Sequence, residues 1–348
     1  MRSYKEHLIL SGTRIKDALL QLDKLASDAI LFVVDEKDKL IGSLTDGDVR
    51  RALIKDIGTS AAVDEIIQPN PKQIKKNDYD IHKVIEYRNS DYRILPIVDE
   101  EGTVTNVINF RLLKSYLPVD AIIMAGGRGS RLAPLTDTIP KPLLPVGDKP
   151  IMEHNLDRLA LYGIDDFWVS IRYLGEQIVD YFGKGESKNI QIDYLREDEP
   201  LGTIGAVSKV QEFKHDYVLL TNSDLLTNLD YEQFFIDFIK NDADISIVSI
   251  PYQVDIPYAV LETRENLITN FKEKPSYTYY SNGGIYLFKK EILESIPKNT
   301  FYNATDLLDK AIANQRKVIS YPLSSYWLDV GKPADYEKAQ RDINQIKF

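Results

Sequence analysis

The chain has 348 residues, of which 43% are hydrophobic and 28% charged, with a formal net charge of −10 and no cysteine. The negative charge argues against nucleic acid or an anionic membrane surface as a partner, and the missing cysteines exclude disulfides and cysteine-ligated zinc. Residues 1–10 lack the apolar core of a secretion signal, and no apolar run could span a bilayer. We therefore expect a cytoplasmic protein of about two domains.

The first 116 residues contain a repeated unit of two strands joined by an acidic turn. In the first copy, two β-rich runs are followed by Thr45-Asp46-Gly47-Asp48, a sequence typical of a helix cap, with a helix expected from near Val49. A similar unit returns 64 residues later. The expected strands are residues 30–34, 40–44, 95–98 and 104–110. An internal repeat of this kind indicates a pseudo-twofold pair of units.

The string GSLTDGDVRR in this region resembles the CBS motif (cystathionine-β-synthase type). The resemblance implies a small α+β regulatory domain over residues 1–116, in which Thr45 and Asp48 contact the phosphate and ribose of an adenine nucleotide. The second copy has Asn109 and Leu112 at the matching positions, and a leucine cannot accept a hydrogen bond from a ribose hydroxyl. We expect one nucleotide site at most. A pair kept only for dimerisation is the alternative.

A second kind of pattern begins at Val119. An apolar run to Ala125 predicts a buried strand, which leads into Gly126-Gly127-Arg128-Gly129. A glycine turn after a strand can approach phosphate closely and direct backbone N–H groups at its oxygens. Leu132 stands where a dinucleotide fingerprint needs its third glycine, and no Walker string occurs.

Strands and helices alternate through the rest of the chain, which predicts a mostly parallel sheet between two layers of helices. We expect strands over residues 167–171, 190–194, 217–221 and 245–250, and helices over residues 151–161, 175–182 and 231–240. Shorter strands over residues 258–262, 267–272 and 283–288 are expected to form an antiparallel annex. Residues 333–346 are expected to form a closing helix.

The segment AGGRGSRLAPLT, followed by PKPLLPV, resembles the signature of the sugar-1-phosphate nucleotidylyltransferases. The resemblance implies a Rossmann-like, three-layer α/β catalytic domain over residues 117–348. It also implies a reaction in which a nucleoside triphosphate and a sugar-1-phosphate give a nucleotide sugar and pyrophosphate, with Mg²⁺ or Mn²⁺ as cofactor. The nucleotide is expected at the glycine turn, on Ala125, Gly126, Gly127, Gly129 and Ser130.

Charge is the main obstacle to joining two polyanions, since two unit charges about 4 Å apart repel by about 4 kcal/mol at an effective dielectric of about 20. The resemblance assigns Arg131 to the triphosphate, Lys141 to a phosphate group, and Asp224 and Asp329 to the metal, with Arg131, Lys141 and Asp224 as the catalytic set. Sugar phosphates are already ionised at neutral pH, so no general base is required.

Two further strings match substrate-binding elements of the family. Gly202 and Thr203 in EPLGTIGA are expected near the base and sugar, where Ile204 replaces the usual alanine and could reshape the pocket. Four residues are expected at the sugar phosphate: Glu273 and Lys274 in FKEKP, and Asn282 and Gly283 in NGGIY.

A CBS pair ahead of this transferase most resembles the glucosamine-1-phosphate guanylyltransferases of bacterial legionaminic acid synthesis. This architecture predicts GTP and glucosamine-1-phosphate as substrates. A mannose-1-phosphate guanylyltransferase, or a uridylyl or thymidylyl enzyme acting on glucose-1-phosphate, is the alternative. The alternative that is not an enzyme is a nucleotide-sensing scaffold, which binds nucleotide without turnover. We expect a homodimer or larger homo-oligomer, because CBS pairs commonly associate.

Overall fold

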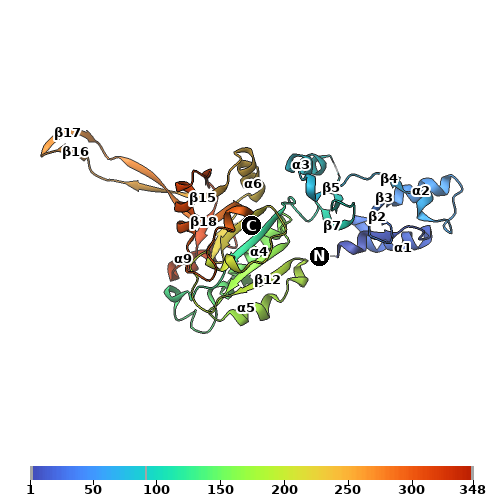
Figure 1. Ribbon diagram of the computed structural model, residues 1–348, viewed down its shortest axis with the longest axis horizontal. Coiled ribbons are helices and arrows are strands. Elements are labelled where there is room, and N and C mark those ends of the chain that lie inside the picture. Colours follow the sequence, from blue (N-terminus) through green and yellow to red (C-terminus); the bar gives the residue numbers. More distant parts are fainter. Residues whose placement is uncertain (1–2, 91, 346–348) are drawn as a thin grey trace. The chain divides into compact units, whose positions relative to one another are not determined.

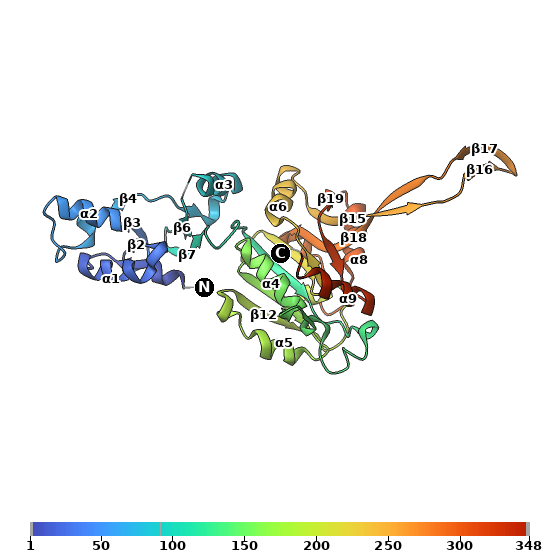
Figure 2. The ribbon, with the colours of Figure 1, turned by 180° about the vertical axis from the view of Figure 1, so that it is seen from behind.

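The computed structural model describes residues 3–90 and 92–345 (Figures 1 and 2). The chain divides into two compact units. The first contains residues 1–118, 159–165 and 185–191, and the second contains the remainder. Each unit is described separately below. No helix in the described ranges is long and apolar enough to cross a membrane.

The first unit consists of two similar halves, each with a small sheet and helices. The first half forms the sheet β1-β2-β3-β4 and the second forms β5-β6-β7. The elements are β1 (Leu8–Leu10), α1 (Ile15–Leu25), β2 (Ile30–Val34), β3 (Leu40–Thr45), α2 (Asp46–Ile54), β4 (Gln68–Pro69), β5 (Ile74–Lys75), α3 (Ile81–Asn89), β6 (Ile94–Val98) and β7 (Val104–Asn109).

The hydrogen bonds of the two halves follow the repeat seen in the sequence. Ile30 pairs with Thr45 in the first half and Ile94 pairs with Asn109 in the second, a shift of 64 on both strands, and each ladder has a bulge at the corresponding place. The halves meet at a bridge between Lys39 and Thr103. There the N–H of Leu40 donates to Gly102 (3.0 Å), and that of Val104 donates to Asp38 (2.9 Å). The predicted pseudo-twofold pair is therefore present.

The second unit is built on a seven-stranded sheet in the order β12-β11-β8-β13-β18-β15-β19. β11, β8 and β13 run parallel, and β15 and β19 are parallel to each other. The strands are β8 (Val119–Met124), β11 (Asp166–Ile171), β12 (Gln191–Arg196), β13 (Tyr217–Asn222), β15 (Ile245–Asp255), β18 (Ser276–Lys289) and β19 (Val318–Pro322). Short ladders join β9 (Pro145–Val146) to β10 (Lys149–Pro150), β14 (Leu225–Thr227) to β20 (Trp327–Asp329), and β16 (Val260–Arg264) to β17 (Leu267–Lys272).

Helices cover both faces of this sheet because side chains alternate along each strand. On β13, Val218 belongs to a core cluster that also contains Leu307 of α8, while the ring of Tyr217 packs edge-on against Phe235 of α6 at 5.3 Å between centroids. The three-layer prediction is thus confirmed. The helices of the unit are α4 (Ile151–Leu161), α5 (Gly175–Phe182), α6 (Tyr231–Lys240), α7 (Lys290–Leu293), α8 (Ala304–Ala313) and α9 (Pro333–Asp342).

Two elements differ most from the sequence prediction, and α2 also begins at Asp46 instead of near Val49. Residues 283–288 do not belong to an annex. They form the inner half of β18, which lies antiparallel between β13 and β15 in the main sheet. The closing helix begins at Pro333 as expected but ends at Asp342, and the last residue predicted for it, Ile346, lies outside the described residues.

Candidate active site

The glycine turn follows the carboxyl end of β8, beside the carboxyl end of β13. Met124 and Asn222 are register partners at these ends, which is where open α/β sheets bind ligands. Gly129 adopts a φ of +66°, and a Cβ on it would lie 3.0 Å from the Cβ of Lys141. Its carbonyl accepts a hydrogen bond from the Thr136 hydroxyl (2.9 Å). Glycine suits this position, because the left-handed backbone and the close lysine would both strain a side chain.

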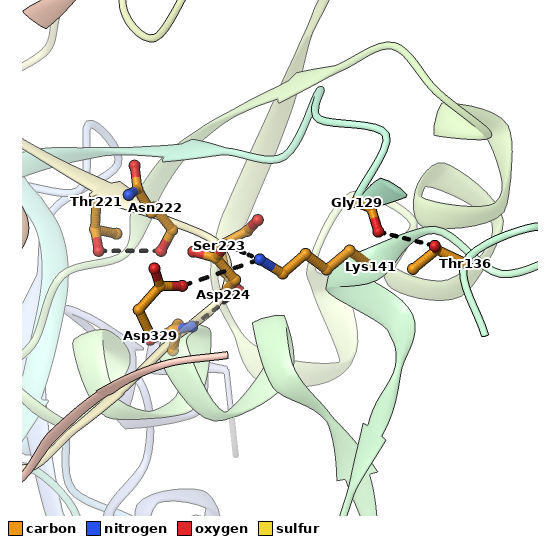
Figure 3. Close-up of polar contacts among 9 residues, drawn as sticks. Gly129, Thr136, Lys141, Thr221, Asn222, Ser223, Asp224 and Asp329 are labelled. Atoms are coloured by element: carbon orange, nitrogen blue, oxygen red, sulfur yellow. Dashed lines mark hydrogen bonds and ion pairs between the residues drawn. The ribbon is translucent and has the colours of Figure 1, made fainter. Parts of the chain in front are cut away.

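Lys141 extends from a one-turn 3-10 helix (Lys141–Leu143) that has a proline on each side of the lysine. Its side chain is 11% exposed, and its ammonium forms an ion pair with the Asp224 carboxylate. Asp329 Oδ1 lies 4.0 Å from the same nitrogen. Figure 3 shows the lysine directed at both carboxylates.

The two aspartates meet because two short strands pair. β14 directly follows Asp224, β20 ends at Asp329, and the antiparallel register places Leu225 opposite Asp329. The N–H of Val330 also donates to the Asp224 carbonyl (3.0 Å). This ladder brings together two carboxylates that are far apart in the sequence.

The electrostatics of the pair suit a divalent cation. Asp224 Oδ1 and Asp329 Oδ1 are buried atoms without a hydrogen-bond partner in the described part of the chain. Burial, and then the charge of Asp224, raise the pKa of Asp329, while Lys141 and Arg131 oppose the rise. Two unpartnered carboxylate oxygens that repel each other are the hard donors that Mg²⁺ and similar ions bind. The residues therefore fit a divalent metal.

A cavity of about 370 Å³ lies beside these carboxylates. All the nucleotide-site and catalytic residues expected from the sequence line it, namely Ala125, Gly126, Gly127, Gly129, Ser130, Arg131, Lys141, Gly202, Thr203 and Asp224. Asp329 adjoins them through Lys141. The roles assigned to these residues stay predictions, but the structure brings them to one place.

Glu197 also lines the cavity, and the sequence analysis did not predict it. It is 9% exposed, accepts a hydrogen bond from the hydroxyl of Ser170, and accepts another from the N–H of Leu201 at 3.0 Å. A Cβ on Gly126 would lie 2.8 Å from one of its oxygens. Glu197 thereby joins the loop at residues 200–203 to β11 and lies close against Gly126. Its only signal in the sequence was a position just after an expected strand.

Arg172 and Phe301 also line the cavity and were also missed. Both lie in loops whose path depends on tertiary packing. Gly202 was expected, and its φ is +78°, with the carbonyl of Tyr302 2.6 Å from where a Cβ would stand. Ile204 is fully buried in the core cluster and does not line the cavity.

The four residues expected at the sugar phosphate lie elsewhere. Glu273 and Lys274 stand between β17 and β18, within a projecting ribbon whose far end is the β16–β17 hairpin (Figure 1). Asn282 and Gly283 lie at the base of this ribbon, where the Asn282 amide donates to the Tyr286 hydroxyl (2.7 Å) and the Gly283 carbonyl accepts from the Trp327 indole (2.9 Å). None of the four lines the cavity.

In the first unit, Thr45 and Asp48 form a capping box at the start of α2. Asp48 is 4% exposed and accepts hydrogen bonds from the N–H and hydroxyl of Thr45 (2.8 and 2.6 Å), from Arg51 (2.6 Å) and from Gln68 (2.8 Å). A separate cavity of about 240 Å³ is lined by residues of the second half, including Lys72, Lys75 and Lys83, and by neither Thr45 nor Asp48.

Known proteins with similar sequences and folds are sugar-1-phosphate nucleotidylyltransferases, and this is the class of enzyme to which the site belongs. The family model described as nucleotidyl transferase matches residues 120–346, more than half of the chain, so the chain belongs to this family. The CBS domain model matches residues 7–55. The predicted fold class, a mostly parallel α/β nucleotidyltransferase domain with a CBS domain at the N-terminus, and the predicted enzyme class are confirmed.

Three relatives illustrate the similarity. The chain is 33% identical over 228 residues to D-glycero-alpha-D-manno-heptose 1-phosphate guanylyltransferase of Aneurinibacillus thermoaerophilus, covering 65% of this chain and 98% of that protein. It is 30% identical to mannose-1-phosphate guanylyltransferase of Mycobacterium tuberculosis, covering 65% of this chain and 64% of that protein. The crystal structure of HddC from Yersinia pseudotuberculosis complexed with GMP-PN has 27% identity and a TM-score of 0.51, covering 65% and 99% of the two chains.

Proposed function

We propose that the protein transfers GMP from GTP to glucosamine-1-phosphate with Mg²⁺ as cofactor, giving GDP-glucosamine and pyrophosphate for bacterial legionaminic acid synthesis. The observation that carries the transfer reaction is the pair of carboxylates at Lys141 beside the glycine turn, each with one buried oxygen that accepts no hydrogen bond from the described residues. The choice of GTP is supported by relatives named guanylyltransferases. The choice of glucosamine rests on the CBS domain ahead of the transferase.

The chain's own residues would bind, orient and neutralise the substrates. Backbone N–H groups of residues 126–130 and the Arg131 guanidinium would hold the triphosphate, and Lys141 would contact a phosphate beside Asp224 and Asp329. Bound Mg²⁺ would neutralise phosphate charge as a Lewis acid. An oxygen of the sugar phosphate then forms a bond to the α-phosphorus while the bond to the pyrophosphate oxygen breaks. In-line alignment provides the rate enhancement, because no proton needs to be removed.

The test is a matrix of four nucleoside triphosphates against the 1-phosphates of glucosamine, mannose, glucose and the manno-heptose, with pyrophosphate release as the readout. We expect the highest kcat/KM with GTP and glucosamine-1-phosphate, and loss of turnover with EDTA that Mg²⁺ restores. A higher value for mannose- or heptose-1-phosphate would replace glucosamine. No turnover with any pair would favour a nucleotide-sensing scaffold.

We also propose that the first unit binds an adenine nucleotide near Thr45 and Asp48 and regulates the transferase. The support is the match to the CBS domain model over residues 7–55. Calorimetry with AMP on the wild type and on Asp48→Asn tests this, because AMP lacks the leaving group that the catalytic site requires. Heat that disappears in the variant supports the site. Equal heat in both proteins, or none in either, would leave Asp48 with its capping role alone.

A further inference from the structure

The second unit carries a long two-stranded arm, residues 250–281. The inner halves of β15 and β18 belong to the main sheet, but from Ser249 opposite Asn282 to Asp255 opposite Ser276 the two strands continue as a ribbon. The β16–β17 hairpin forms its tip. The arm projects away from the sheet in both views (Figures 1 and 2).

The arm exposes far more apolar surface than its structure can stabilise alone. Many of its large apolar side chains are more than half exposed, namely Tyr252, Tyr258, Leu261, Leu267, Ile268, Phe271, Tyr279 and Tyr280. A two-stranded ribbon with no third strand or helix against it is marginal in water, and its open edges invite pairing with another chain. An apolar surface of this kind marks an interaction site.

The same arm carries charged groups that the chain does not use internally. Lys272 is paired with Glu262 at 3.0 Å. In contrast, Glu273 and Lys274 have no ion pair or side-chain hydrogen bond within residues 3–90 and 92–345. Lys274 also has a φ of +40°, which is uncommon for a lysine. Both residues belong to the FKEKP motif, which resembles the sugar-phosphate-binding motif of the family.

Geometry separates this lysine from the cavity of its own chain. The ribbon from Ser249 to Asp255 spans about 20 Å at the usual rise per residue, and its register is continuous over that length. Lys274 lies beyond the end of that span. It could reach its own cavity only if the ladder broke, which would expose the hydrogen-bonding groups of several residues.

The cavity in turn lacks positive charge for a second anionic substrate. Arg131, Lys141 and Arg172 are matched by Glu197, Asp224 and Asp329, and Lys141 is already paired with an acid. Even with a divalent ion, a triphosphate and a sugar phosphate together carry more negative charge than these groups offset. The cavity also presents an apolar edge, since Phe301 lines it and is 60% exposed.

We propose that the arm enters the catalytic cavity of a second copy of this chain, where Lys274 binds the sugar phosphate and the arm's apolar side chains become buried. The inference rests on the proposed transferase function. A reciprocal exchange gives a closed twofold dimer in which each site is completed by its partner, and exchange of an identical element is a low-cost route to such a dimer.

Complementation between two inactive variants tests the exchange. Lys274→Ala removes the arm's charge, Asp224→Asn disables the cavity, and we expect Lys274→Ala to lower kcat/KM for the sugar phosphate about 100-fold. Co-expression with two affinity tags and purification on both isolates the mixed dimer, which should regain about half of the wild-type turnover because one of its two sites is intact. No recovery would overturn the proposal. Lys272→Ala, on the same arm, is the matched control and should keep full activity.

A cross-linking experiment tests the exchange without measuring activity. Because the chain has no native cysteine, each introduced cysteine is the single thiol of its chain. Lys274→Cys and Phe301→Cys are prepared separately, mixed, allowed to exchange subunits, and treated with a short bis-maleimide. We expect a covalent dimer that contains one chain of each kind. Cross-linking of Lys274→Cys chains with each other would indicate that the arms of two chains associate with each other and would overturn the proposal. So would a cross-link formed only within a chain carrying both substitutions. A mixed dimer from a protein without turnover would instead refute the transferase function and leave the exchange standing.

Discussion

Two buried acidic sites, one in each unit, differ in how their carboxylate oxygens are partnered. Asp48 in the first unit accepts hydrogen bonds on both oxygens, from Thr45, Arg51 and Gln68. Asp224 and Asp329 in the second unit each keep one buried oxygen without a hydrogen-bond partner among the described residues. Burial alone raises the pKa of Asp48, but the hydrogen bonds from Thr45, Arg51 and Gln68 outweigh it and leave the pKa lowered. For Asp329, burial and the Asp224 charge leave the pKa raised.

This difference in hydrogen bonding distinguishes a carboxylate that stabilises the fold from carboxylates that are available to bind a ligand. A buried polar atom without a partner costs stability, so the second arrangement persists only where something else selects it. An unpartnered oxygen is not sufficient by itself, since Asp120 at the start of β8 also has one but is completely enclosed in the core. Asp224 and Asp329 differ because two such oxygens lie together beside a cavity and a lysine.

The largest expected effect is on the reaction. Asp224→Asn keeps the size of the side chain but halves the charge available to a metal, and several kcal/mol of transition-state stabilisation correspond to a loss of about 10³-fold in kcat. Steady-state pyrophosphate release measures it. Asp230→Asn, the same change at the N-cap of α6, should leave turnover unchanged because asparagine also caps well. A loss smaller than about fivefold in Asp224→Asn would remove this residue from the metal site.

Asp329→Asn should lower kcat less than Asp224→Asn does. We also expect this variant to be more stable than the wild type at neutral pH. The folded-state pKa of Asp329 is raised, so its ionisation destabilises the fold as the pH rises through that pKa. The variant should therefore unfold at a higher temperature than the wild type at pH 7 in EDTA, and at the same temperature near pH 3, where both forms are neutral. Calorimetric scans at the two pH values check the sign. Titration with Mn²⁺, followed by its electron paramagnetic resonance signal, should show weaker binding. Lower stability of the variant at pH 7, with unchanged Mn²⁺ affinity, would contradict the assignment.

Asp48→Asn should lower stability at neutral pH, in contrast to Asp329→Asn. Of the three variants it should have the smallest effect on turnover. Its lowered pKa means that the stability it provides is present above the unfolded-state pKa and is lost as the pH falls through the folded-state pKa. We expect the free energy of unfolding of the first unit to fall by about 1–3 kcal/mol at pH 7, with turnover retained. Asp46→Asn, an exposed change in the same helical turn, should be nearly neutral. Equal stability of the two variants in urea unfolding would show that the capping box contributes little.

Local patterns in the sequence predicted much of this molecule. Helices α4, α5 and α6 have the bounds expected from their apolar periodicity. The 64-residue repeat predicted the strand pairing of the first unit, including where the two halves correspond. The glycine turn and Lys141 lie close together in the sequence and in space. Such features are set by interactions among neighbouring residues, which the sequence displays directly.

Only the tertiary structure decided which distant segments meet. The β14–β20 ladder brings Asp224 beside Asp329, Glu197 joins the loop at residue 201 to Ser170 of β11, and β18 lies inside the main sheet instead of an annex. The outer half of the same strand pairs with β15 to build the arm, which extends beyond the annex expected from the sequence. Strand pairing joins backbones through hydrogen bonds that are nearly independent of side-chain identity. The sequence therefore shows which residues can form strands, while competition among all possible partners determines which strands pair.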